Sequence, residues 1–154
     1  MIKKVIILTT FIIYIFNSSL SSKQHINIKK IISQYDYLEL NKDNFYFLCE
    51  ILEIQYIDIV YKQAVLESGC FKSLFFKKTN NMFGMKVPRR RASFAIQNKK
   101  TKTGYAFFYT WVHSLADYKL WQGNEIIRED YYEYLKRRNY AESKLYIKKL
   151  KGIK

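Results

Sequence analysis

Glu67 is an isolated acid in a long basic stretch of the chain. It lies in the segment Gln63-Ala64-Val65-Leu66-Glu67-Ser68-Gly69, and no further Asp or Glu occurs before Asp117. The segment between the two acids carries many cations, namely Lys72, Lys77, Lys78, Lys86, Arg89, Arg90, Arg91, Lys99, Lys100 and Lys102. A single carboxyl group among cations and aromatic rings could serve as a general acid. The chemistry would then depend on where a second catalytic group is found.

The residues before Glu67 predict the helix that would position it. Asp58 could cap a helix over roughly residues 58–69. Ile57, Val60, Ala64 and Glu67 follow one another at spacings of three, four and three, so they share one face of that helix. Glu67 therefore extends an apolar stripe at the C-terminal end of the helix.

This position has consequences for the carboxyl group. Loss of hydration at an apolar edge raises the pKa of a carboxyl, and the partial negative charge of a helix C-terminus acts in the same direction. Nearby lysines would oppose both effects. The alternative is that Glu67 turns into solvent or pairs with Lys62 or Lys72, although neither lysine has the ideal helical spacing.

The remaining pattern predicts a mainly helical α+β domain. Asn41 or Asp43 could cap a helix that carries Phe45 and Leu48, and a short helix and turn follow over 70–86. Beyond Pro88 the pattern becomes extended. Residues 93–98 and 105–110 are typical of two strands joined by a polar turn over 98–104. Helices are expected again from about residue 114, through 131–135, and over 141–150. The expected architecture is a helical lobe with one inserted β-hairpin lobe.

The chain divides into three parts in this interpretation. Residues 1–22 have a basic start, an apolar run from Val5 to Phe16 and small residues after it, which is typical of a signal peptide. An uncleaved N-terminal anchor is the alternative. Residues 23–40 are interpreted as an N-terminal extension, and residues 41–154 as the folded domain. We therefore expect an exported protein of the periplasm or cell envelope, or a secreted one, with no stable membrane insertion after cleavage.

The charge of the chain points to an anionic partner. The sequence has 27 basic and 13 acidic side chains, and removal of residues 1–22 leaves 25 and 13, a net charge of +12. An exported protein of this charge suits an anionic envelope polymer, and we do not expect nucleic acid as its partner. Cys49 and Cys70 could pair in an oxidising compartment, and this question is open. With only His25 and His113 available, no metal site and no cofactor are expected.

Four segments of the chain resemble the glucosaminidase domains of glycoside hydrolase family 73, in matching order and spacing over about residues 45–153. They are 63–69, Asn80-Asn81-Met82-Phe83-Gly84-Met85-Lys86, the run from Tyr109 to Tyr118, and Asn139-Tyr140-Ala141 with the segment 146–150. The resemblance implies a lysozyme-like α+β fold with a groove between two lobes. It also implies peptidoglycan as the substrate and hydrolysis of the β-1,4 bond that follows N-acetylglucosamine, although some relatives are muramidases.

The resemblance also implies roles for particular residues. Glu67 falls on the general acid of the family and Tyr140 on a recurrent active-site tyrosine. The groove floor and substrate contacts fall on Asn80, Asn81, Phe83 and Gly84. Among the aromatic residues, Tyr109 is the one we expect to stack on a sugar face, because pyranose rings present C–H faces to aromatic rings. We expect the protein to be a monomer.

The sequence departs from the family where a second carboxylate is expected. Many relatives carry one in the hairpin lobe, whereas no Asp or Glu occurs here from Pro88 to Ala116. Three alternatives are open. The N-acetyl group of the substrate could attack the anomeric carbon, with Tyr140 orienting it. Asp117, or Glu125 or Glu129 beyond it, could fold back to the groove. Finally, the domain could be inactive and only bind glycan.

Overall fold

The computed structural model describes residues 25–97, 99–141, 143 and 145–153. The signal peptide predicted over 1–22 lies outside the described residues. Within the described part of the chain, no helix has both the length and the apolar composition needed to cross a bilayer. Cys49 is buried, Cys70 is exposed and both are free thiols, so the two cysteines do not pair.

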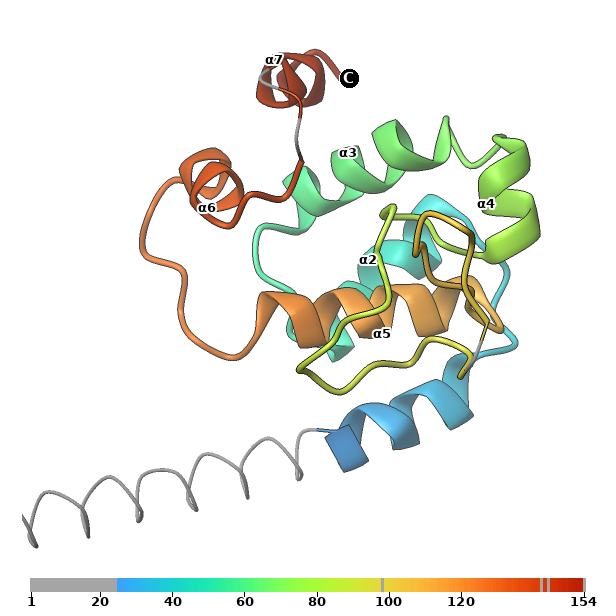
Figure 1. Ribbon diagram of the computed structural model, residues 1–154. Helices are drawn as coiled ribbons and strands as arrows, with labels where there is room; N and C mark the ends of the chain where they lie inside the picture. The colour runs from blue at the N-terminus through green and yellow to red at the C-terminus, as the bar shows by residue number, and fades with distance from the viewer. Residues whose placement is uncertain (1–24, 98, 142, 144, 154) are drawn as a thin grey trace, which may run out of the picture.

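Helices make up most of the described structure, which confirms the mainly helical prediction (Figure 1). Residues 25–35 form a first helix, and six more follow it: α2 (Lys42–Ile51), α3 (Ile57–Ser68), α4 (Leu74–Thr79), α5 (Trp111–Gln122), α6 (Tyr131–Arg137) and α7 (Tyr146–Lys151). α3 packs against α2 and also against α7, which is far from it in the sequence.

The first helix lies in the segment interpreted as an extension. Its residues Ile28 and Ile32 are buried in the same hydrophobic cluster as the core of the domain. Their spacing of four puts them on one helix face. At least this part of the segment 23–40 therefore packs as part of the fold.

Helix ends follow the local sequence in several places. Asn41 is the N-cap of α2, where its side chain accepts a hydrogen bond from the Asn44 N–H at 2.8 Å. α3 starts one residue before the predicted Asp58, and the Asp58 carboxylate instead accepts a hydrogen bond from the Tyr46 hydroxyl. Gly69 ends α3 with a φ of 59°, a left-handed conformation that glycine adopts without strain. Glu67 therefore lies in the last turn of α3, as predicted.

The predicted β-hairpin lobe is wrong. Residues 86–110 form a loop whose described part contains two isolated antiparallel bridges, Lys86 with Tyr105 and Lys100 with Ala106, and no strand. The sequence predicted two strands paired with each other, whereas the residues of these segments have other hydrogen-bond partners. Residues 105–110 bond mainly to the turn before the loop, since the Ala106 N–H donates to the Met85 carbonyl and the Phe108 N–H to the Thr79 carbonyl.

The other half of the expected hairpin is held by side chains. The Phe94 N–H donates to the Asp117 carboxylate at 2.9 Å, and the Ile96 N–H donates to the Phe107 carbonyl at 2.8 Å. One backbone hydrogen bond and one hydrogen bond to a carboxylate do not form the ladder of a β-sheet. The extended residues satisfy their polar groups individually, and this is why the segment folds as a loop over α5.

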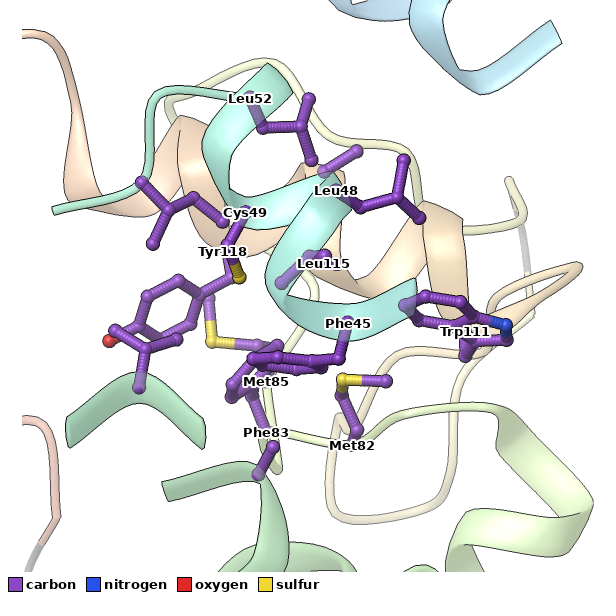
Figure 2. Packing of buried hydrophobic residues seen from close by; sticks show 14 of the residues in the cluster. Phe45, Leu48, Cys49, Leu52, Met82, Phe83, Met85, Trp111, Leu115 and Tyr118 are labelled. Carbon is purple, nitrogen blue, oxygen red and sulfur yellow. The ribbon is translucent and has the colours of Figure 1, made fainter. Parts of the chain in front are cut away.

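The core lies between α2, α5 and the turn that follows α4. Figure 2 shows Phe45 and Leu48 of α2, and Leu52 at its C-cap, near side chains of α5 and of the turn, including Leu115, Tyr118, Met82 and Met85. Met82 and Phe83 are almost completely buried. The turn over residues 80–86 is therefore anchored in the core, and its position relative to α3 is fixed.

Candidate active site

A groove of about 540 Å³ runs along the C-terminal end of α3. Glu67 lines it together with Phe83, Gly84 and Tyr140, all of which were predicted site residues. The segments that contribute these residues lie far apart in the sequence, so tertiary packing brings them together. Glu67 is the only carboxylate among the described residues that line this groove.

Gly84 gives the Glu67 carboxyl its space. Gly84 has a φ of 61°, and a Cβ built on it would lie 3.1 Å from Glu67 Oε2. Any larger residue would be strained at that backbone conformation and would also crowd the carboxyl. The close approach of backbone to acid therefore explains a glycine at this position.

Asn81 holds the turn that carries Gly84. Its side chain is fully buried, accepts a hydrogen bond from the Met85 N–H at 2.9 Å and donates to the carbonyls of Met85 and Ala106. Asn80 donates from its side chain to the carbonyls of Phe108 and Tyr109. Neither asparagine lines the groove. Both act on the groove through the backbone that they hold.

Tyr140 braces the same turn from the opposite side. Its hydroxyl donates to the Phe83 carbonyl at 2.8 Å, and its ring packs edge-on against Trp121 at 5.0 Å. Burial raises the pKa of Tyr140, and the neighbouring Tyr146 and Glu67 charges raise it further. Tyr140 is therefore a neutral hydroxyl in the groove beside Glu67.

The Glu67 carboxyl is half-buried and shares the groove with the Tyr146 hydroxyl. Burial raises the pKa of Glu67, and the Tyr146 hydrogen bond opposes that shift by favouring the charged form. The raised pKa agrees with the sequence-based expectation. The group that moderates it is a tyrosine, where lysines had been expected.

Tyr146 is the end of a buried chain of hydrogen bonds. The Gln63 amide donates to the Tyr146 hydroxyl at 3.3 Å, and the Tyr118 hydroxyl donates to the Gln63 side-chain oxygen at 2.7 Å. Because the Tyr118 proton is used in this way, the Tyr131 hydroxyl donates to Tyr118 across a contact of 2.7 Å. All these donors point along the chain toward Tyr146, so each hydrogen bond polarises the next one in the same direction.

The sequence interpretation had assigned no role to Gln63 or Tyr146. A signal for Gln63 was available, because it precedes Glu67 by four residues and therefore lies on the same side of the helix. Tyr146 is on α7, and its approach to Glu67 depends on how α7 packs against α3. No local pattern could have indicated that contact.

Asp117 does not line the groove. Its carboxylate is fully buried, forms an ion pair with Arg91 at 2.7 Å, and accepts hydrogen bonds from the Ser93 hydroxyl and the Phe94 N–H. Both of its oxygens accept hydrogen bonds from the loop that it holds. As a second catalytic carboxylate, Asp117 would have to break these contacts.

Glu125, Glu129 and Tyr109 also lie outside the residues that line the groove. The Glu129 carboxylate pairs with Arg137, and the Glu125 carbonyl accepts a hydrogen bond from Gln55. Tyr109 is exposed and its ring contacts His113. A sugar-stacking role for Tyr109 stays a prediction.

Comparison with protein families agrees with this geometry. The family model described as mannosyl-glycoprotein endo-beta-N-acetylglucosaminidase, named Glucosaminidase, matches residues 42–154. Comparisons with curated proteins and with solved structures gave no match. The matched range includes α2 to α7, the groove and Glu67, and the helical architecture is consistent with a lysozyme-like domain of this kind. The chain belongs to the glucosaminidase family, the family of the endo-β-N-acetylglucosaminidase domains of glycoside hydrolase family 73.

Proposed function

We propose that the protein is an exported peptidoglycan hydrolase that cleaves β-1,4 bonds of the glycan strand at N-acetylglucosamine, with Glu67 as the general acid. The observation that carries the proposal is the half-buried Glu67 carboxyl, which lines a groove in a glucosaminidase-family domain and has a raised pKa. A carboxyl that keeps its proton near working pH can donate it to the leaving oxygen.

The second catalytic group is proposed to be the substrate itself. The N-acetyl carbonyl oxygen attacks the anomeric carbon while Glu67 protonates the departing glycosidic oxygen, which gives a cyclic oxazolinium ion and a free hydroxyl on the leaving sugar. Water then attacks the same carbon and the Glu67 carboxylate takes up its proton. The bond from this carbon to the acetamido oxygen breaks, which restores the N-acetyl group. Support comes from the described lining of the groove, where Glu67 is unaccompanied by another acid.

The Glu67→Gln variant provides the first test. We expect it to release no new reducing ends from purified peptidoglycan sacculi, because the amide has no proton to donate. Mass spectrometry of the fragments from the wild-type protein would show N-acetylglucosamine at the new reducing end. Muramic acid at that end would instead identify a muramidase. Retention of near wild-type release by Glu67→Gln would refute the assignment.

Substrate assistance has a separate chemical test. Glycan strands whose N-acetyl groups have been removed lack the internal nucleophile, so we expect the wild-type protein not to cleave them. Cleavage of these strands would favour a carboxylate of the protein. The variants Asp117→Asn and Glu142→Gln would then identify it, the second because residue 142 lies outside the described residues and follows Ala141.

An inactive wall-binding module is the alternative function. It is favoured by the same shortage of acids in the described groove, together with the net charge of +14 of the full chain. Co-sedimentation with sacculi without release of reducing ends would support a binder over an enzyme.

A further inference from the structure

Basic side chains outnumber acids among the described residues that line the groove. Lys86, Arg91 and Arg138 all line it, whereas Glu67 is the only acid among its described lining residues. Hydrolysis of an uncharged sugar polymer would not require basic side chains at this wall.

The three cations differ in what they contact. The Arg91 guanidinium forms a paired hydrogen bond with the buried Asp117 carboxylate, so its charge is compensated inside the protein. The Lys86 ammonium lies 5.7 Å from the centre of the Tyr105 ring. Arg138 is the one to consider further, because its contacts orient the guanidinium without compensating its charge.

The Arg138 guanidinium lies near two aromatic rings. It is 5.0 Å from the centre of the Trp121 ring and 5.7 Å from that of Tyr134, and it donates one hydrogen bond to the Trp121 carbonyl at 2.9 Å. Its backbone N–H donates to the Tyr134 carbonyl at the end of α6, which fixes the base of the side chain. The side chain is thus held in one orientation before any ligand binds.

Ion pairs among the described residues use Arg91, Lys136 and Arg137, and none of them involves Arg138. A guanidinium has five N–H donors, and the contact with Trp121 uses one of them. The remaining donors form a planar fork that matches a carboxylate. These donors are available to a carboxylate at the wall of the groove.

We propose that Arg138, stacked on Trp121, forms a subsite that binds a carboxylate of the substrate and thereby selects acidic glycan strands over neutral N-acetylglucosamine polymers. This inference rests on the proposed function for its catalytic consequences. Two sources can supply the carboxylate in peptidoglycan. One is the peptide attached to the muramic acid residue, and the other is the lactyl group of that sugar once the peptide has been removed.

Position favours a group that branches from the strand. Arg138 and Trp121 line the same groove as Glu67, whereas Arg137 does not. A carboxylate that branches from a strand bound beside Glu67 would meet Arg138 at the wall of this groove.

Arg138→Gln and its neighbour Arg137→Gln provide a matched pair for the test. Both changes remove one positive charge, but Arg137 is paired with Glu129 and does not line the groove. Hydrolysis would be measured on intact strands, on strands freed of peptide and on neutral N-acetylglucosamine oligomers. We expect Arg138→Gln to raise KM for at least one acidic substrate about tenfold, the factor that corresponds to one lost charge-assisted hydrogen bond. The kcat should be unchanged, and Arg137→Gln should behave as the wild type.

The three substrates identify the source of the carboxylate. An effect on intact strands alone indicates the peptide, and an effect on peptide-free strands indicates the lactyl group. Neutral oligomers should show no difference between Arg138→Gln and the wild type. We expect Arg138→Lys, which keeps the charge but loses the planar fork, to recover only part of the affinity.

Equal effects of Arg137→Gln and Arg138→Gln would overturn the subsite, because they would indicate a general effect of charge. An equal loss on neutral oligomers would overturn it as well. If the wild-type protein cleaves none of the substrates, the hydrolase proposal fails.

The subsite can then be tested by co-sedimentation with sacculi and with chitin. If Arg138→Gln binds sacculi more weakly than Arg137→Gln does, and the two bind chitin equally, the subsite is supported. Equal binding of the two variants to sacculi would refute the subsite.

Discussion

At the scale of single residues, the chemistry depends on how the Glu67 carboxyl is balanced between two influences. Burial favours its protonated form, and the hydrogen bond from Tyr146 favours its charged form. A general acid needs both, since it must hold a proton at the start of the reaction and tolerate a charge after giving it up. Gly84 adds the room in which the carboxyl can meet a glycosidic oxygen.

The raised pKa of Glu67 predicts how stability varies with pH. The folded protein holds this proton to a higher pH than the unfolded chain does. The stabilisation is therefore complete below the ordinary glutamate range and is lost as pH rises through the raised value. Glu67→Gln does not ionise, so we expect it to gain stability relative to the wild type over that window. Thermal unfolding of both proteins between about pH 4 and pH 8 measures the difference. A constant difference across the range would contradict the prediction.

The Tyr146→Phe variant tests the effect of the Tyr146 hydroxyl on the pKa of Glu67. Without the hydroxyl, the charged form of Glu67 loses a donor, so the pKa of Glu67 should rise further. We expect the alkaline limb of the pH–rate profile to move to higher pH and kcat to fall about tenfold with KM unchanged, the cost of one hydrogen bond to a charged group.

Tyr134→Phe is the control for Tyr146→Phe. Tyr134 is a buried tyrosine whose hydroxyl donates to the Gln122 carbonyl, and it does not line the groove. Its pH–rate profile should match that of the wild type. If the two variants have the same profile, Tyr146 contributes only packing.

At the scale of elements, hydrogen bonds from buried side chains hold the segment between α4 and α5. A β-hairpin would be held by backbone hydrogen bonds between its two strands. Asp117 of α5 binds Arg91, Ser93 and the Phe94 N–H, and Asn81 binds the backbone of Met85 and Ala106. These two buried residues fix one loop from its two ends. The groove wall that contains Arg91 depends on the first of them.

Asp117→Asn should therefore affect stability. The change leaves the Arg91 charge without its buried partner, and breaking such a pair costs about 3 kcal/mol. Urea denaturation measures the loss. Glu129→Gln, which breaks the exposed pair with Arg137, should change stability by less than about 1 kcal/mol. Wild-type stability of Asp117→Asn combined with a complete loss of hydrolysis would instead make Asp117 a catalytic carboxylate.

At the scale of the whole molecule, the site is assembled from the two ends of the matched domain. α3 supplies Gln63 and Glu67, the turn after α4 supplies Gly84, and the C-terminal part supplies Tyr140 and Tyr146. The first helix, over residues 25–35, adds Ile28 and Ile32 to the same core. The basic charge of the chain reaches into the groove, and at Arg138 it has the geometry to bind an acidic polymer.

The sequence by itself determined the local features of this protein. The spacing of Val60, Ala64 and Glu67 predicted a helix that ends with an acid beside its apolar face. Asn41 was one of two residues predicted to cap the preceding helix, and it is the N-cap of α2. These features can be predicted because periodicity and capping depend on near neighbours in the chain. The order of four short segments indicated the family that the comparison then showed.

Only the tertiary structure decided which groups meet. The sequence after Pro88 does not indicate that its hydrogen-bond partners are the turn after α4 and Asp117. The expected hairpin was wrong for this reason. The same limit applies to Asp117. The sequence indicated it as a possible second acid, whereas in the structure it binds the loop before α5. It applies also to Tyr146, whose contact with Glu67 joins the end of α3 to the start of α7. Contacts between residues far apart in the chain leave no local pattern, because the free energy that forms them comes from packing of the whole fold.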